Sequence, residues 1–263
     1  MNVKGKTVLL TGATGGLGQA IARKLAGAGA SLVLSGRRAD VLADLADEIG
    51  AEVVAADLSD PAAVQELAAA QSSVDIFIAN AAVPASGRLE TYSAEQIERA
   101  LVVNLHAPIF LTHALAPQMV ARGSGHILFM SSLAGKTATA GSSLYNATKY
   151  GLRGFAGAMR AELHGTGVGV SAIFPGFIRD AGMFADANVT LPKGVGTKSP
   201  EHVATATLRA IERNRGEIDV APVGLKVGAT FGGVAPELAA FVTRKSGGDK
   251  VAMQFETGQL DKR

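Results

Sequence analysis

The sequence predicts an α/β fold in which helices cover both faces of one doubly wound parallel sheet. Short β-branched apolar runs alternate with longer helical patterns, which is typical of parallel strands joined by helices. Hydrophobic residues make up 48% of the composition and charged residues 18%, so there is enough apolar material for a compact core. Neither a low-complexity linker nor a fixed repeat divides the sequence, and we expect one domain over residues 1–263.

The first eighty residues contain four apolar strand patterns separated by three helical ones. Strands are expected at 8–10, 32–34, 52–55 and 74–78. Helices are expected at 16–28 and 41–49, and a third is opened by Ser59, Asp60 and Pro61. Proline is favoured at the first helical position, which supports the start of that third helix.

The second half continues this alternation and then becomes irregular. A helix is expected over 93–122, a strand over 126–130, a helix over 142–164 and a strand over 168–174. Residues 176–200 mix apolar side chains with four glycines, and long loops of this kind are usually lids or disordered segments. We favour a lid over an apolar ligand, formed by Phe177, Met183, Phe184 and Leu191.

Composition and charge exclude several classes of function. The chain has no cysteine, which rules out disulfides, thiolate metal sites and cysteine nucleophiles. Its five histidines show no ligand spacing, so we expect no bound metal. The formal net charge is +2, and because lysines and arginines form no basic run we expect no nucleic-acid partner.

We expect no integral membrane segment, because no uninterrupted apolar run is long enough to cross a bilayer. The nearest candidate, residues 220–242, contains Pro222, Lys226, Pro236 and Glu237. We expect this stretch to cover a ligand pocket, as part of a variable C-terminal segment that spans residues 220–263. Because the N-terminal apolar run leads directly into a glycine loop, cleavage of a signal peptide there would remove a core strand, and we expect a cytoplasmic protein.

A glycine-rich loop, TGATGGLG, joins the first expected strand to the first helix. Glycine permits a tight turn, a close approach of the backbone and close packing of helix on strand, and a helix N-terminus favours a phosphate. A P-loop is disfavoured because no Lys-Ser or Lys-Thr pair follows. We therefore favour a dinucleotide site over a purely structural turn. Its residues are Gly12, Thr14, Gly16, Leu17 and Gly18.

Tyr145 and Lys149 lie four residues apart near the start of an expected helix, so their side chains share one face. A nearby ammonium favours a phenolate, and we expect Lys149 to lower the pKa of Tyr145 from about 10 toward the working pH. Ser132 follows the strand at 126–130, at the edge where open α/β sheets bind ligands. The alternative is that tyrosine and lysine form an ordinary surface pair.

Together these motifs resemble the main branch of the short-chain dehydrogenase/reductase family. The loop matches T-G-x-x-x-G-x-G, starting at Thr11, the helix carries Y-x-x-x-K, and Ser132 stands thirteen residues before Tyr145, at the family's spacing. The resemblance implies a Rossmann fold in which Ser132 holds the substrate oxygen, Tyr145 is the general acid or base, and Lys149 orients the cofactor ribose. It also implies that Asn104 holds a water in a proton relay, although asparagine in an apolar helix commonly satisfies a backbone group.

The same resemblance implies further contacts to the cofactor. Asp57 would contact the adenine, with a helix N-cap as the alternative, and Asn80 would steady the central sheet. Two positions depart from the pattern, because Ala82 stands where glycine is usual and Asp180 replaces a threonine that contacts the nicotinamide carboxamide. An ionised aspartate cannot donate a hydrogen bond, whereas the backbone of Ile178 can still reach the carboxamide. The other implied cofactor residues are Leu58, Ala81, Pro175 and Gly176.

The end of the second strand favours NADP(H) over NAD(H). Relatives that prefer NAD carry an acidic residue there for the ribose 2′-hydroxyl, whereas here Gly36 provides no carboxylate and Arg37 and Arg38 follow. A guanidinium binds phosphate through paired hydrogen bonds, so we expect the arginines to hold a 2′-phosphate. The alternative is that one of the two merely faces solvent.

The sequence therefore predicts an NADP(H)-dependent oxidoreductase that transfers a hydride between nicotinamide and a carbonyl or secondary alcohol of an apolar small molecule. One alternative is a non-catalytic NADP(H)-sensing regulator or scaffold with the same fold. Another is a sugar-nucleotide epimerase or dehydratase, although such relatives usually have a G-x-x-G-x-x-G loop and a longer substrate domain. The V-D-G-G strand of many tetrameric relatives is missing from the C-terminal sequence, so a homodimer and a homotetramer both stay open.

Overall fold

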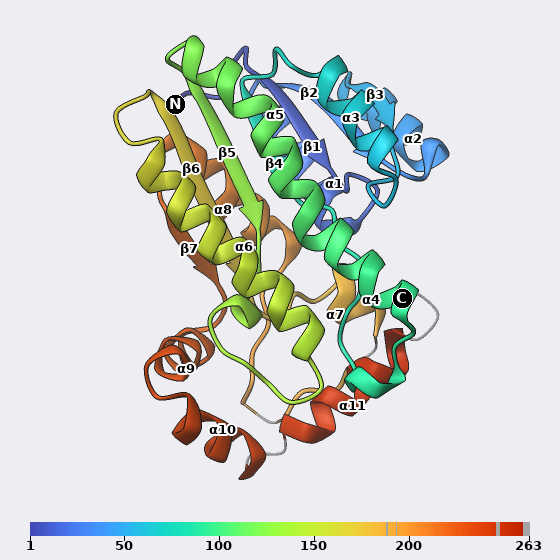
Figure 1. Ribbon diagram of the computed structural model, residues 1–263, viewed down its shortest axis with the longest axis vertical. Helices are drawn as coiled ribbons and strands as arrows, with labels where there is room; N and C mark the ends of the chain where they lie inside the picture. The colour runs from blue at the N-terminus through green and yellow to red at the C-terminus, as the bar shows by residue number, and fades with distance from the viewer. Residues whose placement is uncertain (188, 193, 246–247, 260–263) are drawn as a thin grey trace.

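Seven parallel strands form one sheet through the body of the molecule (Figure 1). The computed structural model describes residues 1–263 except 188, 193, 246–247 and 260–263. The strand order is β3-β2-β1-β4-β5-β6-β7, which confirms the expected doubly wound α/β sheet. The strands are β1 (Thr7–Thr11), β2 (Ser31–Gly36), β3 (Glu52–Ala55), β4 (Ile76–Ala79), β5 (Gly125–Met130), β6 (Val168–Pro175) and β7 (Glu217–Val220).

Helices cover both faces of the sheet, and each face carries its own apolar cluster. Side chains of α1, α2 and α8 pack on one face, and those of α3, α5 and α6 pack on the other. Every residue of β5 and β6 is buried, because a parallel sheet is covered on both sides. The bounds of these helices are α1 (Gly16–Gly27), α2 (Ala39–Ile49), α3 (Pro61–Ala70), α5 (Ala107–Ala121), α6 (Ser143–Glu162) and α8 (Pro200–Glu212).

The helix expected over residues 93–122 is continuous but contains one wider turn. A capping box starts α4 (Ala94–Leu101), a π-helical turn covers Val102–His106, and α5 follows directly. The π-turn carries Asn104, which is completely buried. By length and composition Ala94–Ala121 is the one helix among the described residues that could cross a bilayer, yet 50% of its most apolar window is buried inside the protein.

The C-terminal part contains more helix than its sequence indicates. Residues 176–200, expected to be irregular, include a short helix, α7, and backbone hydrogen bonds join the two ends of this loop. Arg179 N donates to Lys198 O at 2.9 Å, and Lys198 N donates to Phe177 O at 3.0 Å. Beyond the carboxyl ends of the strands lie α7 (Gly182–Asp186), α9 (Val223–Val234), α10 (Pro236–Lys245) and α11 (Gly248–Gln259), with the short 3-10 helices η1 (Leu89–Thr91) and η3 (Leu133–Gly135) (Figure 1).

Replacing Gly18 by alanine is expected to destabilise the protein, whereas the same change at Gly27 of the same helix is not. A Cβ at Gly18 would overlap the carbonyl oxygen of Gly12, but a Cβ at Gly27 would meet nothing within 4 Å. Overpacking costs about 1–3 kcal/mol. Alanine in place of a helical glycine gains up to about 1 kcal/mol. Urea unfolding measures both variants, and equal stabilities would contradict the close packing of α1 on the glycine loop.

Candidate active site

A cavity of about 1470 Å³ opens at the carboxyl ends of the central strands. The strand order reverses between β1 and β4, and open α/β sheets bind ligands in the crevice at such a point. Of the residues that the sequence predicts for the site, all except Asn104 line this cavity. Those lining it are Gly12, Thr14, Gly16, Leu17, Gly18, Arg37, Arg38, Asp57, Leu58, Asn80, Ala81, Ser132, Tyr145, Lys149, Pro175, Gly176 and Ile178.

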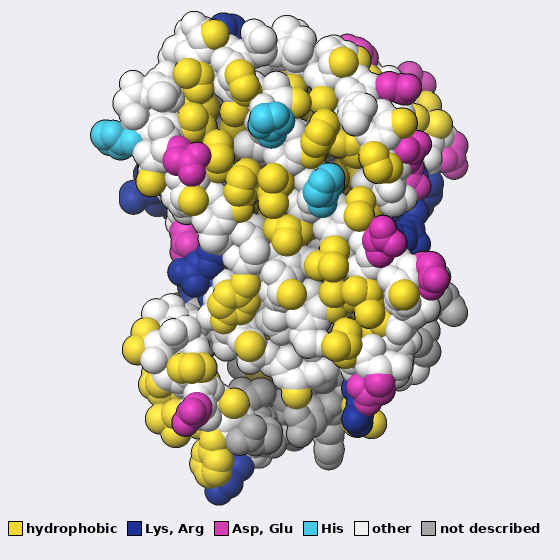
Figure 2. Space-filling view, viewed as in Figure 1, with side chains coloured by type: hydrophobic (Ala, Val, Ile, Leu, Met, Phe, Trp, Pro, Cys, Tyr) yellow, Lys and Arg dark blue, Asp and Glu magenta, His cyan; other side chains and the backbone are white. Residues whose placement is uncertain are grey.

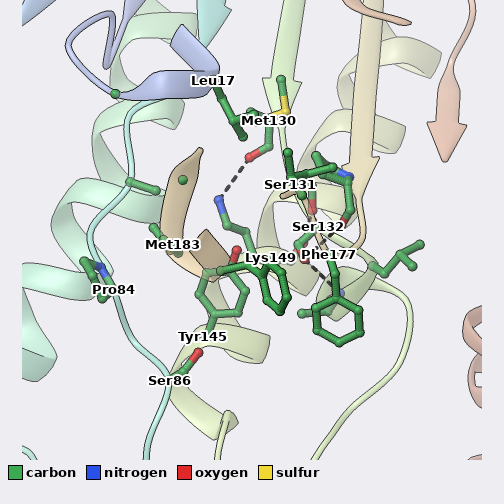
Figure 3. A pocket seen from close by; sticks show the side chains of 18 of the residues that line it. Leu17, Pro84, Ser86, Met130, Ser131, Ser132, Tyr145, Lys149, Phe177 and Met183 are labelled. Carbon is green, nitrogen blue, oxygen red and sulfur yellow. Dashed lines mark hydrogen bonds between the residues drawn. The ribbon is translucent and has the colours of Figure 1, made fainter. Parts of the chain in front are cut away.

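Ser132, Tyr145 and Lys149 come together in this cavity (Figure 3). Ser132 follows β5 and caps η3, where its hydroxyl accepts from Ala134 N at 3.2 Å and donates to Pro175 O at 3.4 Å. Tyr145 and Lys149 stand one turn apart on α6, and the Lys149 ammonium lies 5.6 Å from the centre of the tyrosine ring. The predicted trio is therefore assembled by the end of one strand and the start of one helix.

Lys149 is buried and held at both of its ends. Its ammonium donates to Met130 O, at the end of β5, at 3.0 Å, while its own carbonyl accepts from Ser131 Oγ at 3.0 Å (Figure 3). The residue is 3% exposed. This burial lowers the pKa of Lys149 to about 8, because the interior disfavours the charged ammonium. Within the described residues, the ammonium donates one hydrogen bond, to a neutral carbonyl.

The expectation that Lys149 lowers the pKa of Tyr145 is wrong for this structure. Burial raises the pKa of Tyr145, and a hydrogen bond with Ser132 offsets the rise only in part. The physical reason is that the Lys149 ammonium is directed to the carbonyl of Met130, so it does little to oppose the cost of burying a phenolate. Burial thus favours the neutral form of both side chains.

Asn104 holds a backbone segment in place and does not line the cavity. Its Oδ1 accepts from Val83 N at 2.7 Å, and its Nδ2 donates to Val83 O at 3.0 Å. The structure thus agrees with the alternative given for Asn104, in which a buried asparagine satisfies a nearby backbone group. Through Val83 it anchors the chain that leaves β4 beside the cavity, and the relay role implied by the family resemblance stays a prediction.

The glycine loop is braced from the end of β4. Asn80 Nδ2 donates to the carbonyl oxygens of Thr11 at 3.2 Å and Gly12 at 3.1 Å. Gly12 has a φ of +68°, and a Cβ there would lie 2.6 Å from the Cα of Ala81, so both its conformation and its surroundings require glycine. Asn80 thus fixes the loop by direct contact.

The two departures from the family pattern have different consequences. Ala82 lines the cavity and has an ordinary negative φ, so the backbone there does not depend on glycine. Asp180 has a φ of +70°, and its carboxylate, 70% exposed, pairs with Arg179 Nε at 3.2 Å. That side chain is therefore engaged at the surface, consistent with the expectation that it does not replace the donor function of threonine.

The surroundings of the loop suit a phosphate-bearing dinucleotide. Helix α1 starts with neither a side-chain cap nor an acidic residue in its first turn, so its N–H groups and positive dipole face the cavity. Arg37 and Arg38 line the same region, where Arg38 Nη2 donates to Thr14 O at 2.8 Å. The Ser35 hydroxyl is buried in the cavity lining with no hydrogen-bond partner in the described part of the chain. This donor set fits a nucleotide phosphate and ribose.

Asp57 is not a helix N-cap, so the structural alternative for this residue is wrong. The cap of α3 is Asp60, which accepts from Ala62 N at 2.9 Å. Asp57 instead accepts from the N–H and hydroxyl of Ser59, at 2.9 and 2.7 Å. Burial raises its pKa, but these hydrogen bonds and the charge of Arg37 lower the pKa below its usual range. Asp57 is therefore an ionised acceptor in the cavity lining.

The loop between β6 and α8, called the lid below, contributes to the lining of the cavity, and its closure over a substrate stays a prediction. The four apolar residues named for it from the sequence all line the cavity. It also rests on the glycine loop, because a Cβ added at Gly16 would overlap the side chain of Ala181, and one at Gly182 would lie 3.6 Å from Leu17. The lid therefore extends from the apolar part of the cavity lining to the glycine loop.

Helix α11 contributes residues that sequence reasoning missed. Phe255 packs against Phe177 and Phe184 of the lid, with ring centroids 6.3 and 6.1 Å apart. Gln259 is 1% exposed, its Nε2 donates to Met183 O at 3.4 Å, and its Oε1 has no partner among the described residues. Both Phe255 and Gln259 line the cavity. No motif marks them, and only the apolar spacing within a charged tail could have indicated a buried helix face.

Known proteins are similar to this chain over most of its length. A profile described as short chain dehydrogenase matches residues 6–191. The ketoacyl reductase HetN of Nostoc sp. is 39% identical over 227 residues, covering 82% of this chain and 78% of the relative. A solved short-chain dehydrogenase from Sphingobium yanoikuyae in complex with NADPH has a TM-score of 0.75 and 29% identity, covering 89% of this chain and 95% of that chain. A metagenomic short-chain oxidoreductase in complex with NADP has a TM-score of 0.71 and 32% identity, covering 85% and 99%.

The lowered pKa of Lys149 predicts a pH dependence of stability that comes from this one side chain. An unfolded lysine titrates near 10.4, so between pH about 8 and 10.4 the unfolded chain binds more protons and stability rises with pH. Relative to Lys149→Met, the wild-type free energy of unfolding should rise by on the order of 3 kcal/mol across this window. Below pH about 8 the difference in free energy of unfolding between wild type and Lys149→Met should be constant. Urea unfolding at a series of pH values checks this, and curves that stay parallel throughout would refute it.

Proposed function

We propose a function for this chain from one premise, that it belongs to the short-chain dehydrogenase family. It is thus an NAD(P)-dependent oxidoreductase, and we infer more narrowly that it transfers a hydride between NADP(H) and a carbonyl or secondary alcohol of an apolar small molecule. The observation that carries this proposal is the meeting of Ser132, Tyr145 and Lys149 in one cavity with the glycine loop. A non-catalytic NADP(H) sensor would have no need of that trio.

Ser132 and Tyr145 would act on the substrate oxygen. The hydrogen bond from Ser132 Oγ to Pro175 O is long, at 3.4 Å, so the hydroxyl is easily redirected to a carbonyl oxygen. Because burial raises the pKa of Tyr145, the phenol stays protonated at neutral pH and can give its proton to that oxygen as the carbonyl carbon receives a hydride. In the reverse direction the phenolate accepts the alcohol proton, and the Lys149 ammonium, 5.6 Å from the centre of the tyrosine ring, would stabilise the phenolate.

The cofactor supplies or accepts the hydride when it is bound. The first turn of α1 and the two arginines after β2 would hold its phosphates, and Asp57 would accept from the adenine. The site also places Ile178, which is 4% exposed, at the base of the lid where its backbone is held by the Lys198 bridge. These residues would hold the cofactor at the carboxyl edge of the sheet, in the cavity that Tyr145 and Ser132 also line.

An apolar substrate fits the outer part of the cavity. Its walls there include Phe177, Phe184, Leu225 and Ala229, from the lid and α9. The name of the ketoacyl reductase relative supports a carbonyl group as the reacting centre. We also propose that the protein is located in the cytoplasm and that it forms a homodimer or homotetramer.

Removal of the Tyr145 hydroxyl should abolish turnover and spare cofactor binding. Tyr145→Phe keeps the ring packing but removes the proton donor, and loss of a general acid or base costs about 10²- to 10⁴-fold in rate. The wild type should oxidise NADPH with a member of a panel of ketones, aldehydes and acyl thioesters. NADPH titration of both proteins is the control. A near-normal rate in Tyr145→Phe would remove this mechanism, and wild-type binding without turnover on any compound would favour the sensor.

The wild type should bind NADPH about 10- to 100-fold more tightly than NADH, because a hydrogen bond to a charged group contributes about 1.5–3 kcal/mol. Gly36→Asp combined with Arg37→Ala should erode this preference by adding a carboxylate that repels the 2′-phosphate. A Cβ at Gly36 would lie 3.0 Å from Thr14 Cγ2, so Gly36→Ala is the control for crowding and should keep the preference. Isothermal titration with both reduced cofactors measures this, and equal binding by the wild type would refute the assignment.

A further inference from the structure

Exposed apolar side chains gather on the two helices that follow β7. Of twelve large hydrophobic side chains exposed among the described residues, seven lie on α9 and α10. On α9 they include Val223 and Val234, which are 75% and 82% exposed. Figure 2 shows hydrophobic side chains on the projecting lobe at the lower left, where Figure 1 places these helices. The others in this apolar patch are Val227, Phe231, Leu238, Phe241 and Val242.

The outward direction of the patch is enforced by the packing of α9. Its exposed members recur at intervals of four, four and three residues, so they form one stripe along the helix. On the opposite side, Ala229 is buried and a Cβ added at Gly232 would overlap the Thr137 side chain. The helix therefore cannot turn its stripe inward, and contiguous exposed apolar surface of this kind marks a binding face.

The apolar patch is continuous with the lining of the cavity. Phe231 and Val242 belong to both, because both line the cavity and are also exposed, Phe231 by 42% and Val242 by 53%. Leu225 and Ala229, on the inner side of the same helix, also line the cavity. A route for an apolar molecule from the patch into the cavity would thus follow this helix. A second copy of this chain seated on the patch would cover that route.

The charges around the patch suit an anionic surface. Helix α9 contains no acidic residue and carries Lys226, while α10 ends in Lys245 and has Glu237 as its one acidic residue. The Lys245 ammonium lies 4.7 Å from the centre of the Phe241 ring, so charge and apolar surface are adjacent. Helices with an apolar face flanked by basic side chains bind in the interface of bilayers that contain anionic lipids.

We propose that the α9–α10 patch docks on the surface of an anionic lipid bilayer and receives an apolar substrate from it. The docking stands on the exposed stripe, its basic flank and its enforced orientation. The entry of substrate rests in addition on the proposed function. The protein would then lie on the membrane by these helices, with the mouth of its cavity against the lipid.

Vesicle binding tests the docking with the full chain. Wild type should float with vesicles of phosphatidylcholine mixed with phosphatidylglycerol, and less with phosphatidylcholine alone. Val227→Glu combined with Val234→Glu should reduce binding tenfold or more, since neither side chain lines the cavity and both project from the patch. The matched control is Leu89→Glu combined with Val120→Glu, which adds the same charge outside the patch. These two side chains are 50% and 37% exposed, and the control should bind vesicles as the wild type does.

Equal vesicle binding by the patch variant and wild type would overturn the proposal. So would a wild type that binds no vesicles and changes from dimer to monomer on patch substitution, measured by light scattering, because the occupant would then be a second copy. Turnover of a water-soluble ketone should be the same in wild type and patch variant. If wild type binds vesicles but turns over no carbonyl compound, the proposed function is wrong, whereas docking of the patch on a lipid surface is supported.

Discussion

The arrangement of the site depends on the burial of one ammonium group. Lys149 joins α6 to the end of β5 through Met130 O, and its carbonyl receives the hydroxyl of Ser131. A Cβ at Gly135 would lie 2.6 Å from that same carbonyl oxygen, so η3 also closes on this point. Because a buried charge needs a hydrogen-bond partner, this contact holds the helix that carries Tyr145 at the end of β5. The geometry of the trio follows from that constraint.

The strands and the trio could be predicted from the sequence because their signals are local. Short apolar runs mark β1 to β6 directly, and Tyr145 and Lys149 are related by one helical turn. The carboxyl edge of a parallel sheet then brings residues from separate strands together. Gly12, Asn80 and Ser132 therefore meet although they are distant in sequence.

What could not be predicted depends on tertiary burial. The raised pKa of Tyr145 follows from desolvation by surrounding chain and from the direction in which Lys149 points, neither of which is encoded in their spacing. Helix α9 contains four glycines, which weaken its helical signal, yet Gly232 is required where the helix packs on Thr137. Phe255 and Gln259 became site residues only through the docking of α11 on the lid.

The contact between the lid and the glycine loop links the two halves of the cavity thermodynamically. Ala181 packs on Gly16, and backbone hydrogen bonds to Lys198 join the two ends of the lid. A ligand that fixes the glycine loop also restricts the lid, and coupling between two ligands is reciprocal. If the binding of one ligand orders this shared contact, the binding of the other ligand no longer includes the free-energy cost of ordering it. Cooperativity between cofactor and substrate would then need no second conformation, because the two ligands order the same piece of chain.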